Sequence, residues 1–175
     1  LLILLLSLYA LPSFARNYAI LIAGSSGYGN YRHQSDISHY YSYLRHNGYG
    51  HDDIVTFSAH DIVYNDRNHF RGQIFNAPCI GCNGIDYEHT LHVDYNGKNV
   101  TWDNIKHVLL HSIDGEKQND QKVLPLTKND TLLFFFADHG ATGLLELPYD
   151  KKVSVKEFND LLVKLITKNV VGRII

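Results

Sequence analysis

Methionine is absent from the 175-residue chain, including position 1, and cysteine occurs only twice. Because translation begins with methionine, we expect the natural N-terminus to precede Leu1. The two cysteines form one Cys79-x-x-Cys82 pair, and no second pair supplies the remaining ligands of a zinc site. We therefore predict neither a metal nor a cofactor. For the pair itself, a local disulfide and two thiols in a loop both remain open.

A strong excess of charge of either sign is also lacking. The net charge is -2 and the isoelectric point is near 6.6, which gives no electrostatic reason to expect nucleic acid as a partner. Hydrophobic residues make up 45% of the chain and charged residues 19%, a composition typical of folded proteins. The length suffices for one compact domain and is short for two.

The first 15 residues, LLILLLSLYALPSFA, form an apolar run that is shorter than the roughly 20 residues needed to span a bilayer. The run ends in S-F-A at residues 13–15, with small side chains at the -3 and -1 positions of a signal-peptidase site. We predict a signal peptide over 1–15, a mature domain over 16–175 and no stable membrane anchor. A buried N-terminal strand or helix is the alternative.

Two N-glycosylation sequons agree with a secretory route, N-V-T at Asn99 and N-D-T at Asn129. Such triplets also arise by chance, so they support the route only together with the leader. We expect glycans at Asn99 and Asn129.

Apolar patterns predict strands that alternate with helices. The predicted strands are 18–23, 54–57 and 131–137, and the predicted helices begin at about Ser35, after a cap at Thr101, and after a capping box of Ser154 and Glu157. This alternation indicates βαβ units with a mostly parallel sheet. A last apolar run begins at Val170 and continues to Ile175, so we expect the sheet to be incomplete at the C-terminus.

The stretch from about residue 58 to residue 100 is polar and rich in Asn, Asp, His and Gly. An excursion of this length inside a compact domain is unusual and tends to be functional or mobile.

Two polar clusters follow predicted strands, where open α/β sheets bind their ligands. One cluster is 30–34, N-Y-R-H-Q, and the other is Asp138-His139-Gly140. A histidine at a strand end is well placed for general-base work, and a neighbouring glycine lets a substrate carbonyl approach a backbone N–H. The alternatives are a structural role for His139 and, for Arg32, an ion pair with Asp36.

Taken together, these clusters resemble the signatures of one family. Residues 23–36, AGSSGYGNYRHQSD, and residues 136–143, FADHGATG, closely resemble the legumain (asparaginyl endopeptidase) family, the C13-type cysteine peptidases that include vacuolar processing enzymes and haemoglobinases. Lesser matches lie between them, so the resemblance covers nearly the whole mature chain. It implies a caspase-like α/β/α sandwich.

The resemblance also implies a role for each matching position. The implied catalytic set is His139, which activates the thiol, Gly140, whose N–H helps form the oxyanion hole, and Asn30, which orients the histidine ring. Arg32 and His33 match positions that line the S1 pocket, where Arg32 helps to bind the side-chain amide of a substrate asparagine. Asp138 matches an aspartate that is prone to succinimide formation and is associated with ligase behaviour.

The implied function is hydrolysis of protein or peptide substrates after asparagine at P1, in the lysosome, the vacuole or outside the cell. In the family the nucleophilic cysteine follows the strand that begins here near Val171, so we expect it beyond Ile175 and expect the present chain alone to be inactive. Two alternatives remain: a relative of the transamidase that attaches glycolipid anchors, and a secreted α/β binding module without catalysis. The Asp before His139 speaks against the transamidase, which we associate with Gly-His-Gly.

Overall fold

The computed structural model describes residues 15–77, 81, 84–114 and 121–175. The predicted leader, apart from Ala15, and both cysteines of the C-x-x-C pair lie outside the described residues.

The described residues form a five-stranded parallel sheet with strand order β3-β2-β1-β4-β7. Its strands are β1 (Asn17–Ala23), β2 (Ile54–Ser58), β3 (Tyr95–Asn96), β4 (Thr131–Ala137) and β7 (Arg173–Ile174). The main helices are α1 (Tyr31–His46), α2 (Trp102–Asp114) and α3 (Val155–Thr167), and short 3-10 turns precede α1, β2 and α2 at Tyr28–Asn30, His51–Asp53 and Gly97–Asn99. A separate antiparallel hairpin consists of β5 (Leu144–Leu147) and β6 (Lys151–Ser154).

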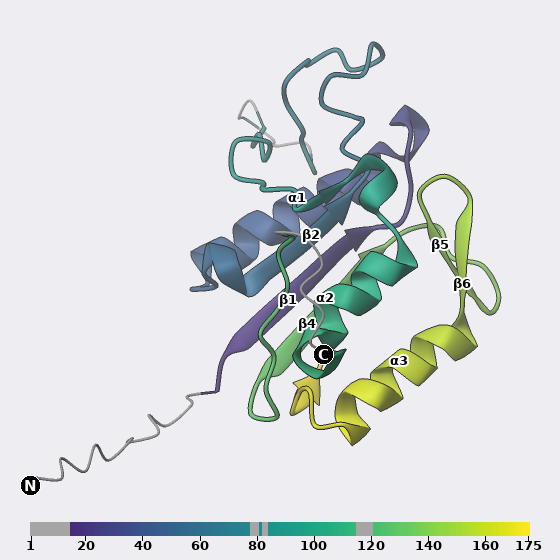
Figure 1. The fold of residues 1–175 in the computed structure, drawn as a ribbon. Coiled ribbons are helices and arrows are strands. Elements are labelled where there is room, and N and C mark those ends of the chain that lie inside the picture. The colour runs from purple at the N-terminus through teal and green to yellow at the C-terminus, as the bar shows by residue number, and fades with distance from the viewer. Residues whose placement is uncertain (1–14, 78–80, 82–83, 115–120) are drawn as a thin grey trace, which may run out of the picture.

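Strand β1 lies at the centre of the sheet, and its side chains alternate between two hydrophobic cores. Tyr18, Ile20 and Ile22 belong to the core that also contains buried residues of α2 and α3. Ala19 and Leu21 belong to the core beneath α1. Because successive side chains of a strand point to opposite faces, α1 covers one face of the sheet while α2 and α3 cover the other (Figure 1). The predicted α/β/α sandwich with its mostly parallel sheet is confirmed.

Most element boundaries follow the sequence patterns closely. Strand β4 occupies the predicted residues, and the capping box of α3 forms as expected, with Glu157 N–H donating to Ser154 Oγ at 3.1 Å. Thr101 caps α2 by accepting a hydrogen bond from Asn104 N–H at 3.2 Å. The start of α1 was predicted about four residues too late: it begins at Tyr31, not Ser35. Its first turn consists of polar residues of the site, so the apolar periodicity starts only later in the helix.

The polar excursion between β2 and β3 folds back onto the start of α1. Ile62, Val63 and Ile74 form a small hydrophobic core of their own, with Tyr31 packed against it. The Tyr31 hydroxyl also accepts a hydrogen bond from Phe75 N–H at 2.7 Å. The described part of the excursion is therefore packed against the helix that carries the site, rather than detached from the domain.

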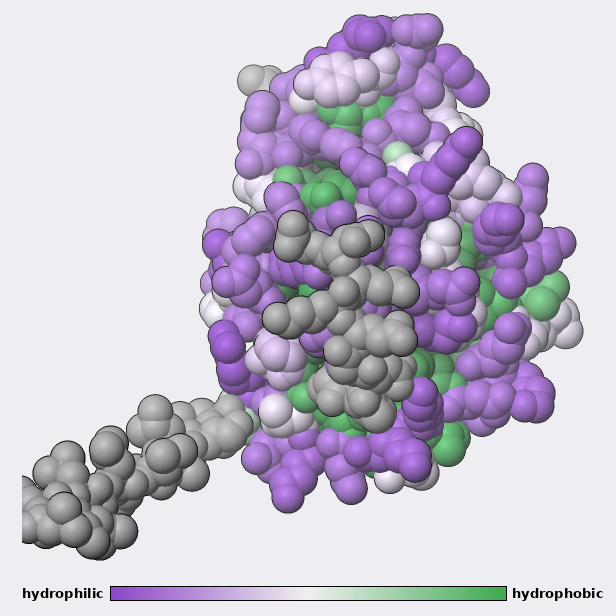
Figure 2. All heavy atoms as spheres, viewed as in Figure 1, coloured by the Kyte–Doolittle hydropathy of each residue, from purple (hydrophilic) through white to green (hydrophobic). Residues whose placement is uncertain are grey.

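The face shown in Figure 2 is mostly hydrophilic, and hydrophobic side chains come to this surface in separate spots. Within the described part of the chain, none of the helices combines the length and apolarity needed to cross a membrane.

Candidate active site

The two predicted polar clusters meet at the carboxyl ends of β1 and β4. These strands pair in register from Asn17 opposite Thr131 to Ala23 opposite Ala137, so the residues that follow them emerge side by side. Gly24 makes this approach possible, because a Cβ at this position would lie 2.5 Å from the Glu146 carbonyl oxygen and 2.8 Å from Asp138 Cβ. Only a residue without a side chain fits between these strand ends.

Asn30 fixes the orientation of the His139 ring. The Asn30 amide nitrogen donates to the Ser26 carbonyl at 2.9 Å, which leaves its Oδ1 facing His139 Nε2 at 2.7 Å. An amide oxygen only accepts hydrogen bonds, so Nε2 carries the hydrogen and Nδ1 of the neutral ring keeps its lone pair. This tautomer makes Nδ1 the ring nitrogen that can accept a proton.

Arg32 contacts the nitrogen atoms of the same ring. Its Nη2 is 3.1 Å from His139 Nδ1 and 3.3 Å from Nε2, and the side chain is exposed. No ion pair joins Arg32 to Asp36 among the described residues. Instead, the Asp36 carboxylate accepts from Asn76 Nδ2 at 2.8 Å. Arg32 therefore contacts His139 directly, although the resemblance implied only a role in substrate recognition.

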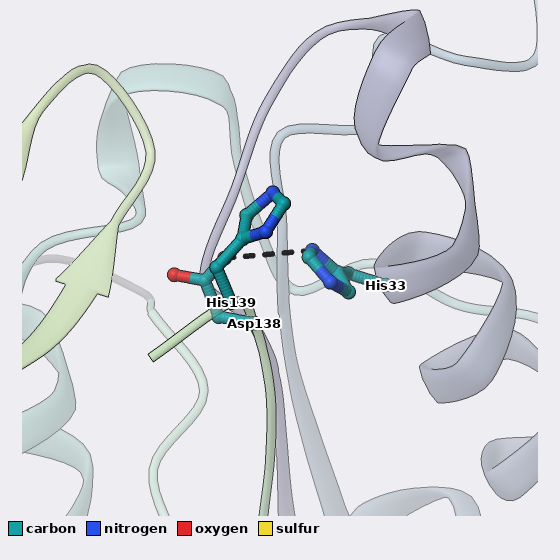
Figure 3. A group of neighbouring side chains, drawn as sticks. All are labelled: His33, Asp138 and His139. Atoms are coloured by element: carbon teal, nitrogen blue, oxygen red, sulfur yellow. Dashed lines mark ion pairs between the residues drawn. The ribbon is translucent and has the colours of Figure 1, made fainter. Parts of the chain in front are cut away.

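His33 is buried beneath His139. Their rings meet edge to face with centroids 4.9 Å apart. His33 Nδ1 lies 2.6 Å from the Ser25 hydroxyl and 3.4 Å from Asp138 Oδ1. Burial lowers the pKa of His33 and the nearby Arg32 guanidinium lowers it further, against the opposing effect of Asp138. The lowered pKa favours the neutral form of His33 despite the adjacent carboxylate. Figure 3 shows the His33 ring facing the two residues that follow β4, with the His33–Asp138 contact as a dashed line.

Gly140 follows His139 with φ of +71° and is exposed. This left-handed conformation favours glycine, and a Cβ here would meet nothing within 4 Å. Backbone conformation rather than lack of space thus explains a glycine at this position.

A pocket of about 320 Å³ opens beside His139. Its lining residues are Gly24, Ser25, Ser26, Asn30, Asp138, His139, Glu146, Leu147, Pro148, Tyr149 and Asp150. Three of the predicted site residues thus line the pocket, whereas Arg32, His33 and Gly140 do not. The wall contributed by the β5–β6 hairpin was not foreseen from the sequence.

Asp61 is a second feature that sequence reasoning missed. Its carboxylate accepts from Gly27 N–H at 2.7 Å and from Gln34 Nε2 at 2.6 Å. It thereby ties the loop after β1 to the first turn of α1, on either side of Asn30. No local sequence signal identifies this role, because Asp61 lies far along the chain in the polar excursion.

The arrangement suits proton transfer. His139 is exposed to the site, its tautomer is fixed, and a neighbouring pocket can admit a substrate. A positioned neutral imidazole is the commonest general base in enzymes.

Comparisons with known proteins agree with this chemistry. The profile of the peptidase C13 family matches residues 17–175. The chain is 41% identical over 145 residues to a hemoglobinase of Schistosoma mansoni, 37% identical over 148 residues to the vacuolar-processing enzyme delta-isozyme of Arabidopsis thaliana, and 38% identical over 147 residues to a legumain of Canavalia ensiformis. These alignments cover 83%, 85% and 84% of this chain and 32%, 31% and 30% of the relatives.

The chain thus spans about a third of the length of these curated relatives. The family match, in contrast, extends over nearly all of the described residues, including both strand ends that carry the site. The chain belongs to the peptidase C13 family.

Proposed function

We propose that the complete protein is a cysteine endopeptidase that hydrolyses peptide bonds after asparagine. The observation that carries the proposal is the His139 ring, whose Nε2 faces Asn30 and whose Nδ1 is left with a lone pair. In this mechanism His139 takes the proton of a cysteine thiol, the thiolate attacks the substrate carbonyl, and His139 returns the proton to the leaving amine. The Gly140 N–H and that of the cysteine stabilise the oxyanion.

The position of β7 supports a nucleophile supplied from beyond Ile175. Strand β7 pairs in parallel with β4, with Ile174 opposite Leu132. Strand β4 ends at Ala137, five residues after Leu132. A continuation of β7 in the same register would therefore reach the level of Ala137, two residues before His139, about four residues beyond Ile175. A side chain at that strand end is held rigidly near the base, which nucleophilic catalysis requires.

Specificity for asparagine would rest on Arg32. An asparagine side chain offers a carbonyl acceptor and an NH2 donor, so a selective pocket needs a donor for the first and an acceptor for the second. Arg32 is exposed beside His139 and can supply the donor. We place the acceptor, like the nucleophile, in the region that follows β7. His33 would shape this pocket from beneath, since it is buried under the His139 ring.

We propose entry into the secretory pathway by a leader cleaved after Ala15, and a destination in the vacuole, the lysosome or the extracellular space. Asn99 and Asn129 are both exposed and so accessible to glycosylation.

We further propose that Asp138 is the succinimide-prone residue that gives the enzyme a ligase activity beside hydrolysis.

The test uses the full-length protein and a series of peptides that differ only at P1. We expect turnover after asparagine, loss of kcat by about 10²–10⁴-fold or more in His139→Ala, and a fall of kcat/KM for asparagine in Arg32→Ala by roughly 10-fold or more. The rate of alkylation by a small thiol reagent serves as a control, because it reports an intact nucleophile without P1 recognition. A folded Arg32→Ala enzyme that keeps its full preference for asparagine would contradict the specificity.

The present chain without the following region should not turn over any of these peptides. Cleavage that disappears in Cys79→Ser or Cys82→Ser would instead place the nucleophile in the polar excursion. Transfer of the peptide to an added amine without hydrolysis would favour the transamidase alternative. Peptide binding by the full-length protein without either reaction would favour the non-catalytic module.

A further inference from the structure

Three potential metal ligands converge at the strand ends. His33 from α1 and the adjacent Asp138 and His139 after β4 each place one donor atom within 4.8 Å of the other two. Figure 3 shows the His33 ring facing the two residues at the end of β4. No other group of three such ligands comes together in the part of the chain that the structure describes.

The Asp138 carboxylate has no hydrogen-bond partner among the described residues, and its contact with His33, whose Nδ1 lies 3.4 Å from Oδ1, is an ion pair only when the imidazole is protonated. The Asp138 side chain is only 1% exposed. A buried carboxylate that is neither paired nor hydrogen-bonded costs several kcal/mol of solvation. A cation bound to the Asp138 carboxylate would compensate this cost.

The spacing of one donor pair fits a single small cation. Two ligands bound tetrahedrally to the same Zn²⁺ at 2.0–2.1 Å are about 3.3 Å apart, and His33 Nδ1 lies 3.4 Å from Asp138 Oδ1. The third ligand, His139, has a ring nitrogen within 4.8 Å of the other two donors and is exposed, so a small shift of its side chain that keeps the Asn30 hydrogen bond can bring it to the ion. Its Nδ1 bears the lone pair, while Nε2–H donates to Asn30 Oδ1 at 2.7 Å. Metal-bound histidines almost always donate their second ring N–H to such an oxygen.

We propose that His33, Asp138 and His139 form a binding site for a single Zn²⁺ ion, with water as the fourth ligand. Two imidazoles and one carboxylate are a donor set typical of zinc, whereas Mg²⁺ and Ca²⁺ prefer oxygen ligands throughout. Two contacts must give way on binding: Ser25 Oγ at 2.6 Å from His33 Nδ1, and Arg32 Nη2 at 3.1 Å from His139 Nδ1. A hydroxyl can rotate, and the exposed Arg32 side chain can swing into solvent.

The ion is an inhibitor rather than a cofactor, a consequence that rests on the proposed function. Zinc bound to His139 Nδ1 occupies the lone pair that would accept the thiol proton. It therefore blocks the base without any change of fold, and the expectation that the protein carries no resident metal is unaffected.

Binding is tested on the chain itself, freed of metal by dialysis against a chelator and titrated calorimetrically with ZnCl₂. We expect one strong site per chain, weakened at least about tenfold in Asp138→Asn and in His139→Ala. Replacement of Zn²⁺ by Co²⁺ should give the visible absorption of a tetrahedral centre, and this absorption should be lost in both variants. Circular dichroism establishes folding, and the exposed His139 provides a second variant if Asp138→Asn does not fold.

His92→Ala is the matched control. His92 Nε2 also lies 3.4 Å from a carboxylate, Asp94 Oδ1, but that carboxylate is already paired with Lys122 at 3.1 Å. We expect this variant to bind Zn²⁺ as the parent chain does. Absence of a strong site would overturn the proposal. Equal weakening of Zn²⁺ binding in His92→Ala, Asp138→Asn and His139→Ala would also overturn it, because the ion would then bind to scattered surface histidines.

The inhibitory consequence is measured separately on the full-length protein. Loss of peptide turnover with Zn²⁺ and its recovery with a chelator would support the assignment of His139 Nδ1 as the base. Strong binding without inhibition would leave the zinc site standing and contradict that assignment. Strong binding to a protein that cleaves no peptide even without metal would contradict the proposed function alone.

Discussion

The nitrogen and the oxygen of the Asn30 side-chain amide both form hydrogen bonds. These bonds set the tautomer of His139, which lies more than 100 positions further along the chain. The amide nitrogen donates to the Ser26 carbonyl at 2.9 Å, so the amide oxygen is left to face His139. The tautomer of the ring thus follows from a backbone carbonyl in the loop after β1. A neutral histidine without such a partner samples both tautomers.

We predict that Asn30→Ala releases this control. In the parent chain, ¹⁵N spectra of the His139 ring at mildly alkaline pH should show the Nε2–H tautomer, and in the variant they should show a mixture. In the full-length protein, kcat should fall by on the order of 10²-fold because the base is misplaced, with less effect on KM. Asn104→Ala is the control, since the Asn104 side-chain amide in α2 makes a similar hydrogen bond to a backbone carbonyl, that of Asn99 in the preceding 3-10 turn. An unchanged ring spectrum in Asn30→Ala would refute the assignment.

The polar excursion is the element whose behaviour depends most clearly on pH. His60 Nε2 lies 3.1 Å from Glu88 Oε1, and this pair joins the start of the excursion to a segment 28 residues further along the chain. The hydrogen bond to Glu88 raises the pKa of His60 and outweighs burial, which lowers it. A group whose pKa is raised on folding stabilises the fold below its unfolded-state pKa, about 6.5 for histidine, and loses this contribution as the pH rises through the folded-state value.

We therefore predict that His60→Gln destabilises the chain mainly at acid pH. Urea unfolding should show a loss of about 1 kcal/mol at pH near 5.5 that shrinks toward zero at mildly alkaline pH. Glu88→Gln should behave in the same way, whereas His69→Gln, at an exposed position of the same excursion, should change little at either pH. A loss that grows with pH would contradict the direction of the pKa shift.

The β5–β6 hairpin could not be predicted from the sequence, because no local turn signal marks it. It turns through Tyr149 and Asp150, both at positive φ of 64° and 60°. The loop between the strands consists of residues 148–150. Short hairpin loops are most readily recognised by a glycine at a position of positive φ, and these three residues include no glycine. The three central elements β1, β4 and α3 were predictable because an unbroken apolar run or a capping box lies within each segment.

Part of the site could also be predicted from the sequence, and part could not. The resemblance drew attention to Asn30, Arg32 and His139, and the structure brings these three together. It could not indicate Asp61 or the wall around Tyr149, because these residues meet the site only through tertiary contacts. Nor could it indicate that Asp138 is buried without a hydrogen-bond partner, which depends on how closely two strand ends approach.

Across the whole molecule, Asp130 connects Arg16, the residue before β1, to the starts of β4 and β7. Its side chain is buried and accepts from Arg16 N–H at 2.8 Å and from the N–H and hydroxyl of Thr127 at 2.7 and 2.8 Å. Its carbonyl accepts from Gly172 N–H and Arg173 N–H at 3.0 and 3.2 Å. The residue just before β1 is thereby fastened to the start of β4 and, through it, to β7.

Cleavage after Ala15 would convert the Arg16 N–H into a charged α-amino group facing this carboxylate. Because hydrogen bonds between charged groups are stronger than those of a neutral amide, we predict that a chain beginning at Arg16 is more stable than one retaining Ala15, by roughly 1–3 kcal/mol in urea unfolding. Acetylation of the Arg16 amine removes the charge without changing the fold and should abolish the gain, as should Asp130→Asn. Equal stability of the two chains, or a gain that survives acetylation, would show that leader removal does not complete this contact.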